Sequence, residues 1–423
     1  MSWLDVTRGP IDWHCVYCGD KGELPHHSSY VFNDFTYHLH KCPGCESLIY
    51  NPAAMGPGFG LRPDETETRI GSKYYFEVAY SAYFTPLWAL ATIPDIGVAD
   101  LKNYNFLDIG AGNGLGSYTI RELFDINVLP VEPSLTGECA REVFGLPVVR
   151  KYFEDIEEDL LAQLKSKPCL VHLDAVIEHL NNPRMLLQNL MSSLDIEVLS
   201  GLVPDGDGIL RDEPFATSVP FLAPSDHVHL PSVAGMDKLF ADLGFPFRHV
   251  IQVSKLLIVI GSKKPIIPPS DQRVRIATDL VLERLAQHPN PMVSGGAASR
   301  LLIDAVGKRK HERIEHFSKQ LLPNFKPEVL VRQLQENRPW MEIPFYCSNL
   351  SYWVAFEIFA AGRYAEALPY LDVIEVFAER IVRDSAVRHG ANDLQMAVAN
   401  FPCADFVRAR TAGRSPCGAA VCY

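Results

Sequence analysis

The stretch that decides the fold is Asn105-Phe106-Leu107-Asp108-Ile109-Gly110-Ala111-Gly112-Asn113-Gly114-Leu115. It begins as a short apolar run that can form a buried strand, and glycines then occupy positions 110, 112 and 114. Glycine is suited to a backbone that must bend sharply and let a ligand approach closely. Residues 115–124 have a helical pattern, and the N-terminus of such a helix would face that ligand. The stretch therefore predicts a strand, a tight turn and a helix at a ligand-binding edge of a sheet.

The next predicted strand, at residues 128–132, ends in a carboxylate. Glu132 follows the glycine-rich turn by about twenty residues, the spacing at which an acidic side chain binds a ribose diol, and Pro133 comes directly after it. Glycine-rich turns alone do not identify the ligand, because mononucleotide, dinucleotide and S-adenosylmethionine sites all use them. Glu132 is predicted to bind a ribose.

Two more strands are predicted before residue 180. The third, near residues 148–151, leads to Asp155 and Ile156, an acceptor and an apolar side chain of the kind that flank an adenine ring. The fourth, at 170–176, includes Asp174 and Ala175 near its carboxyl end. After residue 180, a fifth strand is predicted within 206–220 and a closing pair at 247–253 and 256–261. Strands that alternate with helices in this way indicate an α/β fold with a parallel sheet.

The residues after the fourth strand carry a resemblance to a known family. The run Val176-Ile177-Glu178-His179-Leu180-Asn181-Asn182-Pro183 resembles the Val-(Leu/Ile)-Glu-His-Leu-x-x-Pro pattern of one branch of the class I S-adenosylmethionine-dependent methyltransferases. The likeness covers roughly residues 70 to 262. It implies a Rossmann-like sheet of seven strands. A dinucleotide-dependent dehydrogenase is the alternative, but its usual spacing requires glycine at position 115, where leucine stands.

The resemblance also implies which residues bind S-adenosylmethionine. One of the tyrosines on a lead-in helix at 69–92 could close over the methionine end of the cofactor, although an aromatic packing face is the other interpretation. The full predicted set is Asp108, Gly110, Ala111, Gly112, Gly114, Glu132, Pro133, Asp155, Ile156, Asp174, Ala175 and Tyr75.

Three residues are candidates for catalysis. His227 is the first candidate for a general base and His179 the second, because a neutral imidazole accepts a proton near cellular pH. Glu178 could orient or polarise either ring. A hydrogen-bonded scaffold role is the alternative for both histidines, and His229 ranks below them. In the related family the segment that corresponds to residues 224–230 lines the substrate pocket. Here Leu230 and Pro231 stand where an aromatic residue and serine are common.

Four cysteines have metal-ligand spacing. Cys15-x-x-Cys18 and Cys42-x-x-Cys45 form two knuckles that can place four thiolates around one structural Zn²⁺. Short strands at 30–32 and 37–40 lie between the knuckles, so residues 1–55 are predicted to form a zinc ribbon. His14, His38 and His40 are competing ligands. The ribbon resembles one that precedes the catalytic domain in small-molecule methyltransferases, including sugar C-methyltransferases, where it serves as a lid or a substrate-side wall.

Composition limits the function classes. The chain has 423 residues and a formal net charge of −12, which argues against a nucleic-acid reader. No apolar run has membrane-spanning length, and the first residues lack a basic n-region, so we expect a cytoplasmic protein. A methyltransferase domain is predicted at 56–264 and a mostly α-helical accessory domain at 265–423, with helices at 274–286, 298–316 and 327–335 and a hairpin at 352–383.

The sequence thus predicts an S-adenosylmethionine-dependent methyltransferase with a zinc ribbon that acts on a small molecule. The acceptor atom, whether oxygen, nitrogen or carbon, is left open. An RNA or DNA methyltransferase that grips its substrate with the ribbon is one alternative, and a non-catalytic module that keeps the cofactor fold is another. The helical domain could form a homodimer contact or bind a carrier protein, and the basic cluster Lys308-Arg309-Lys310-His311 is predicted on a solvated helix face.

Overall fold

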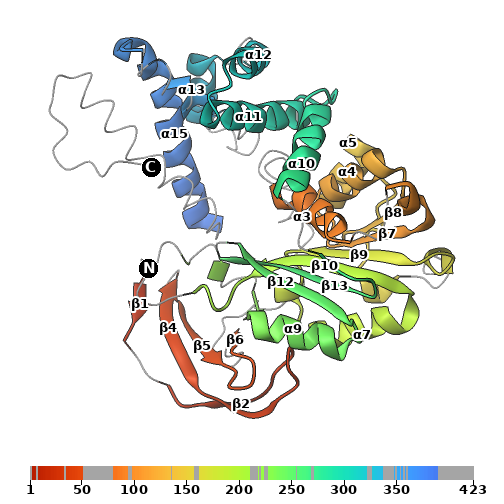
Figure 1. The fold of residues 1–423 in the computed structure, drawn as a ribbon. Helices are drawn as coiled ribbons and strands as arrows, with labels where there is room; N and C mark the ends of the chain where they lie inside the picture. Colours follow the sequence, from red (N-terminus) through yellow and green to blue (C-terminus); the bar gives the residue numbers. More distant parts are fainter. Residues whose placement is uncertain are drawn as a thin grey trace. The chain divides into compact units, whose positions relative to one another are not determined.

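The computed structural model describes most of the chain up to residue 388. The described residues are 2–5, 8–32, 35–50, 80–93, 98–134, 136–156, 162–209, 218, 221–222, 227–253, 255–267, 271–321, 326–336, 347, 350–352, 354–355, 358 and 361–388. Those up to Thr278 belong to one compact unit and those from Asp279 belong to another (Figure 1). Tyr75 lies outside the described residues. Within the predicted lead-in helix, the structure describes α3 (Tyr80–Ala91).

A six-stranded sheet organises the first unit, in the order β12-β13-β10-β9-β7-β8 (Figure 1). Four neighbouring strands are parallel, namely β8 (Asn127–Val131), β7 (Asn105–Ile109), β9 (Cys169–Asp174) and β10 (Ile196–Pro204). Two antiparallel strands complete it, β13 (Leu256–Ser262) and β12 (Phe247–Val253). β7 is buried along its whole length, as expected for a parallel strand covered on both faces. The chain runs from β7 to β8 on one side and later to β9 on the other, so the strand order reverses at β7.

The sheet differs from the prediction in two places. Seven strands are expected, and the described residues contain six in this sheet. The expected third strand at 148–151 makes a single bridge, between Val131 and Val149. The fifth strand, expected within 206–220, is instead β10, so that prediction is wrong. Residues 205–208 form the turn after β10, where the Asp207 N–H donates to Asp205 Oδ1 at 3.0 Å.

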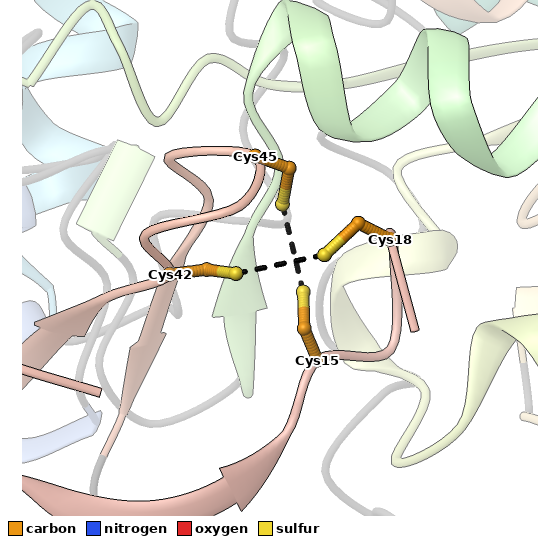
Figure 2. Close-up of side chains that lie close together, drawn as sticks. All are labelled: Cys15, Cys18, Cys42 and Cys45. Atoms are coloured by element: carbon orange, nitrogen blue, oxygen red, sulfur yellow. Dashed lines mark hydrogen bonds between the residues drawn. The ribbon is translucent and has the colours of Figure 1, made fainter. Parts of the chain in front are cut away.

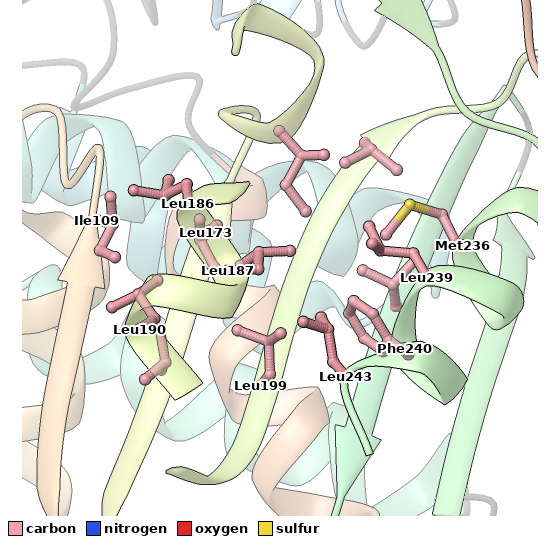
Figure 3. Packing of buried hydrophobic residues seen from close by; sticks show 14 of the residues in the cluster. Ile109, Leu173, Leu186, Leu187, Leu190, Leu199, Met236, Leu239, Phe240 and Leu243 are labelled. Carbon is pink, nitrogen blue, oxygen red and sulfur yellow. The ribbon is translucent and has the colours of Figure 1, made fainter. Parts of the chain in front are cut away.

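Helices cover both faces of the sheet. α7 (Pro183–Ser193) and α9 (Val233–Asp242) bury leucines, Met236 and Phe240 against strand residues such as Leu173 and Leu199 (Figure 3). α3 contacts β9, β10 and α4 (Leu115–Phe124), and α5 (Thr136–Phe144) follows β8. Each fully buried leucine or phenylalanine contributes about 1.5–3 kcal/mol relative to an exposed one. This packing holds the carboxyl ends of the parallel strands in place.

Side-chain caps set the starts of these two helices. Asn182 accepts the Met185 N–H at 3.1 Å, and Pro183 occupies the first turn of α7. Ser232 accepts the Gly235 N–H at 2.9 Å at the start of α9. Both caps satisfy backbone donors that a helix start otherwise leaves without partners.

The N-terminal residues form a second sheet. Its order is β1-β4-β5-β6-β11, with β1 (Ser2–Leu4), β4 (His26–Phe32), β5 (Phe35–Lys41), β6 (Leu48–Tyr50) and β11 (His229–Leu230). A hairpin of β2 (Ile11–His14) and β3 (Lys21–Leu24) accompanies it. The expected strands at 30–32 and 37–40 fall inside β4 and β5. We call residues 2–50 the N-terminal ribbon. The edge strand β11 of this sheet belongs to a part of the chain that is distant in sequence from the other four strands.

The described part of the second unit contains helices. α10 (Asp271–Leu285) leads into it, and α11 (Pro291–Gly307), α12 (His311–Leu321), α13 (Pro327–Gln335) and α15 (Tyr364–Arg388) follow. The single helix expected at 298–316 is wrong, because the chain breaks between α11 and α12. Arg309 in that break has a positive φ of 53°. The basic cluster at 308–311 therefore lies mainly on a turn.

No helix in the described ranges is both long and apolar enough to cross a membrane. The domain boundaries expected after residues 55 and 264 stay predictions.

Candidate functional site

The glycine-rich loop after β7 is fastened to the end of β8. The N–H groups of Gly110 and Ala111 donate to the Val131 carbonyl oxygen at 2.8 and 3.1 Å. The Gly112 N–H donates to Glu132 Oε2 at 2.8 Å. Gly110, Gly112 and Gly114 have φ values of 72°, 54° and 77°, which residues with a side chain rarely adopt. The predicted glycine loop and the predicted ribose ligand are therefore neighbours.

The three glycines have different surroundings. A Cβ atom at Gly110 would lie 2.3 Å from Val176 Cγ2, and one at Gly114 would lie 2.6 Å from Ala140 Cβ. A Cβ atom at Gly112 would meet nothing within 4 Å. Gly110 and Gly114 are thus required by packing, whereas the space beside Gly112 is open, as the close approach of a ligand requires.

Glu132 is buried and keeps capacity to accept hydrogen bonds. Its Oε1 accepts the Ser134 N–H at 2.8 Å, and its Oε2 accepts the Gly112 N–H. An ionised carboxylate has about four acceptor positions, so two remain for the hydroxyls of a diol. Pro133, next to it, is half-buried.

Asp108 has a different environment from Glu132. It is buried in β7, and its Oδ2 accepts the Ser117 hydroxyl of α4 at 2.7 Å. Burial raises the pKa of Asp108 to about 6. Its observed contact joins strand and helix, and contact with a cofactor stays a prediction.

The other predicted cofactor residues lie after β8 and at the end of β9. The Glu132 N–H donates to the Val149 carbonyl oxygen at 3.0 Å, which brings the segment leading to Asp155 and Ile156 alongside β8. Asp155 is exposed at the end of a 3-10 turn, η3 (Phe153–Asp155), and Ile156 is buried in the core. Asp174 is the last residue of β9 and is half-buried.

Ala175, which follows β9, adopts a left-handed conformation with φ 52°. Such a conformation costs about 1–3 kcal/mol in a residue other than glycine and often accompanies functional sites. Ligands in open α/β sheets bind outside the carboxyl ends of the strands where the strand order reverses. The ends of β7, β8 and β9 provide that position here.

The three predicted catalytic residues lie together. Glu178 and His179 belong to a 3-10 turn after β9, η4 (Ile177–His179). Glu178 Oε1 lies 3.9 Å from His227 Nε2, and the rings of His179 and His227 are 4.8 Å apart. Glu178 and His227 are buried, whereas His179 is exposed.

Hydrogen bonds determine the tautomers of His227 and His229, both of which are buried. His227 Nδ1 lies 2.9 Å from the Phe221 carbonyl oxygen, and because a carbonyl only accepts, Nδ1 must carry the proton. His229 donates from Nε2 to the Leu180 carbonyl oxygen at 2.8 Å and accepts the Tyr17 hydroxyl at Nδ1. Burial lowers the pKa of His227 to about 3 and that of His229 to about 4, so both rings are neutral. His229 therefore has a scaffold role.

The sequence did not reveal how the N-terminal ribbon holds this cluster. We call residues 227–230 the acceptor-side segment. The Val228 N–H donates to the Glu178 carbonyl oxygen at 2.9 Å, and the Tyr50 N–H donates to the Val228 carbonyl oxygen at 3.3 Å. β11 pairs antiparallel with β6. No spacing pattern predicts a two-residue strand or the partner of Tyr17, because both depend on tertiary contacts.

Ser47 and Ser232 also connect the N-terminal ribbon to the residues that follow β11. The Ser232 N–H donates to Ser47 Oγ at 3.1 Å, and the Ser232 hydroxyl donates to the Cys45 carbonyl oxygen. A Cβ atom at Gly235 would lie 2.3 Å from Ser47 Oγ, so glycine is needed there. The second cysteine knuckle is therefore packed directly against the start of α9.

The four predicted cysteine ligands converge (Figure 2). Cys15 Sγ lies 3.5 Å from Cys45 Sγ, and Cys18 Sγ lies 3.6 Å from Cys42 Sγ. These separations exceed the roughly 2.05 Å of a disulfide and approach the roughly 3.8 Å expected of four sulfurs around one zinc ion. The donor set therefore fits structural Zn²⁺. Two of the competing histidines bond elsewhere, His38 to Ser29 Oγ and His40 to the Leu24 carbonyl oxygen.

Comparison with known proteins finds similarity to solved structures. No family profile and no curated protein matches the chain. An O-methyltransferase family protein from Burkholderia thailandensis is 11% identical, covers 47% of this chain and has a TM-score of 0.36. The chain spans 60% of the length of that protein and of a similar structure from Nostoc punctiforme.

Two further structures in this comparison are methyltransferases. An S-adenosylmethionine-dependent methyltransferase from Aquifex aeolicus is 14% identical, with 47% of this chain and 98% of that chain covered and a TM-score of 0.33. The plantazolicin methyltransferase, solved with S-adenosylhomocysteine, is 12% identical, with 47% and 91% covered and a TM-score of 0.35. Similarities this low give no information about substrate, so the proposals below depend on the residues of this chain.

Proposed function

We propose that this chain transfers a methyl group from S-adenosylmethionine to a small-molecule acceptor. The observation that carries the proposal is the shared edge of β7, β8 and β9. There a positive-φ glycine loop with open space at Gly112 meets the buried carboxylate of Glu132. Three candidate catalytic residues lie together nearby: Glu178 and His179 follow β9, and His227 faces them.

Each part of this edge has a proposed task. The backbone of the glycine loop and Glu132 would bind and orient the cofactor, with Glu132 accepting from its ribose. When bound, S-adenosylmethionine supplies a methyl group on a sulfonium, which is already a good leaving group. Most of the catalysis is then alignment, which contributes up to about 7–11 kcal/mol in favourable cases. If the acceptor must lose a proton, His227 is the candidate base, with Glu178 beside its Nε2.

The N-terminal ribbon is proposed as a zinc ribbon with a structural role. Cys15, Cys18, Cys42 and Cys45 would hold the ion with no position left for a substrate. Through β6 and Ser47 the ribbon supports the acceptor-side segment, which is consistent with a substrate-side wall. The chain's net charge of −12 favours a small molecule over a nucleic acid as the acceptor.

A labelling experiment tests the proposed reaction. The purified protein is incubated with methyl-labelled S-adenosylmethionine and either the small-molecule fraction or the nucleic-acid fraction of a cell extract from its source. Label in a small molecule, lost in the Glu132→Ala variant, is the expected result. Label in nucleic acid would replace the proposed acceptor with the alternative, and no label in either fraction would favour the non-catalytic module.

A further inference from the structure

We propose that Glu178, His179 and His227 together bind one divalent transition-metal cation beside the methyl-donor site, a site separate from the four cysteines. One carboxylate oxygen and one ring nitrogen from each histidine all lie within 4.8 Å of one another. A cation at about 2.0–2.2 Å from each ligand would draw these atoms somewhat closer. Two imidazoles and one carboxylate suit Mn²⁺, Fe²⁺, Co²⁺ or Zn²⁺.

The tautomer of His227 fits a metal ligand. Its Nδ1–H donates to the Phe221 carbonyl oxygen, so the lone pair of Nε2 is directed into the cluster. Metal-binding histidines commonly donate their other ring N–H to a carbonyl oxygen in this way, because the bond fixes the ring orientation. The histidine is therefore already oriented for coordination by its second nitrogen.

The facing atoms of Glu178 and His227 are too far apart to satisfy each other. Nε2 of a neutral His227 and the Glu178 carboxylate are both acceptors, and 3.9 Å is too long for a hydrogen bond between them. Glu178 is only 1% exposed, and its Oε2 is buried without a hydrogen-bond partner among the described residues. A buried carboxylate is costly unless it is paired or coordinates a metal. A cation at this position would satisfy both groups.

The neighbouring His229 shows that the arrangement is selective. It is as buried as His227 and lies two positions away, yet both of its ring nitrogens are occupied, by Tyr17 and by the Leu180 carbonyl oxygen. His229 therefore has no lone pair left for a metal. Between His227 and His229, the fold leaves an acceptor nitrogen only on His227, the one that faces Glu178.

This inference rests on the proposed function and narrows it to an acceptor that binds through oxygen. A hydroxyl oxygen of the acceptor would coordinate the cation and lose its proton to solvent. Its lone pair would then form the new C–O bond while the S–C bond breaks, with the bonding electrons moving to sulfur. The cation would thus take over the task assigned to a histidine base, and an acceptor with two adjacent oxygen donors would fit best.

Binding of Mn²⁺ tests the site, because carboxylate and imidazole ligands hold this ion whereas thiolates prefer zinc. Zinc-loaded protein is titrated with Mn²⁺, and the loss of the free-ion signal is followed by electron paramagnetic resonance. We expect one Mn²⁺ per chain and a loss of affinity of at least about tenfold in Glu178→Gln and in His179→Ala. His179 is exposed, so its variant should fold even if Glu178→Gln does not. His311→Ala, exposed on α12, is the control and should bind normally.

Two results would overturn the inference, and both differ from failure of the proposed function. Absence of Mn²⁺ binding to the wild type, or unchanged affinity in His179→Ala, would exclude the cation site. Calorimetry with S-adenosylmethionine on the same samples separates the two proposals. Cofactor binding without Mn²⁺ binding would overturn only the metal site, and Mn²⁺ binding without cofactor binding would overturn the methyltransferase assignment.

Discussion

At the scale of single residues, the positions that were predictable are those whose chemistry depends on local spacing. The turn at Gly110 and Gly112, the strand end at Glu132 and the convergence of the four cysteines were expected from the chain alone, because each requires a particular residue type at a fixed offset. Binding of a cofactor or a metal at these residues stays a prediction. The partner of Tyr17 and the hydrogen bond that orients His227 could not be predicted. Tyr17 and His229 are 212 positions apart, and His227 bonds to a backbone carbonyl oxygen, a group that every residue carries.

Gly110→Ala should destabilise the protein more than a change at an equally left-handed glycine with open surroundings. An alanine Cβ at position 110 (φ 72°) would lie 2.3 Å from Val176 Cγ2, whereas one at position 145 (φ 60°) would have nothing within 4 Å. We expect Gly145→Ala to cost about 1 kcal/mol and Gly110→Ala about 1–3 kcal/mol more. Urea unfolding measures both. Equal losses would mean that the loop does not pack against Val176 as described.

The buried carboxyl of Asp108 should make stability depend on pH. Its pKa is about 6 in the folded protein, against an unfolded value of about 3.9, so the folded state binds more protons between these values. Stability therefore falls as pH rises through this window, by up to about 2–3 kcal/mol, and the loss persists at higher pH. The free energy of unfolding of wild type minus that of Asp108→Asn, measured in urea at several pH values, should decline from pH 4 to pH 6–7. A flat difference would contradict the assigned burial.

At the scale of elements, the errors have physical causes. β10 follows α7 almost directly, with few turn residues to mark its start, and the glycine- and aspartate-rich residues 205–208 that suggested a boundary lie after it. β11 is two residues long, and these residues form a strand only through their antiparallel pairing with β6. The break between α11 and α12 follows Gly307, a residue that a helical pattern tolerates. Periodicity identified α4, α13, β12 and β13 because each is a regular, self-contained pattern.

Loss of zinc from the N-terminal ribbon should destabilise the hydrogen bonds of the acceptor-side segment. Cys42→Ser is expected to abolish zinc stoichiometry and to raise hydrogen exchange at residues 228–230, which bond to β6 and to Glu178. Exchange in β7 should stay slow, because β7 is buried between β8 and β9. Mass spectrometry of the exchanged protein measures both segments. Zinc loss with unchanged exchange at 228–230 would show that the ribbon does not support the site.

Tyr17→Phe examines the same connection without touching the metal. The variant removes the hydroxyl that His229 accepts and leaves a buried ring nitrogen without its partner. A loss of about 1–3 kcal/mol in the free energy of unfolding is expected, with zinc content unchanged. A neutral effect would imply that this hydrogen bond contributes nothing to holding the first cysteine knuckle against β11.

At the scale of the whole molecule, the two larger sheets of the first unit are joined beside the candidate site. The six-stranded sheet presents the glycine loop and Glu132 at its carboxyl edge, and the N-terminal sheet incorporates β11 and so holds His227 and its neighbours near that edge. The fold class was predictable because alternating strands and helices are recorded in local patterns. The joining of the two sheets was not, because it depends on hydrogen bonds between residues about two hundred positions apart, such as Ser47 and Ser232. A homodimer or carrier-protein contact through the second unit stays a prediction.

The central claim is that the edge beside Gly112 and Glu132 binds S-adenosylmethionine, and isothermal titration calorimetry tests it most directly. The wild type should bind one molecule per chain. Glu132→Ala should lower the affinity at least about tenfold, because it removes the charge-assisted hydrogen bonds to the ribose. Glu142→Ala, which removes an exposed carboxylate from α5, should bind as the wild type does. No binding by the wild type, or equal affinity in Glu132→Ala, would contradict the account.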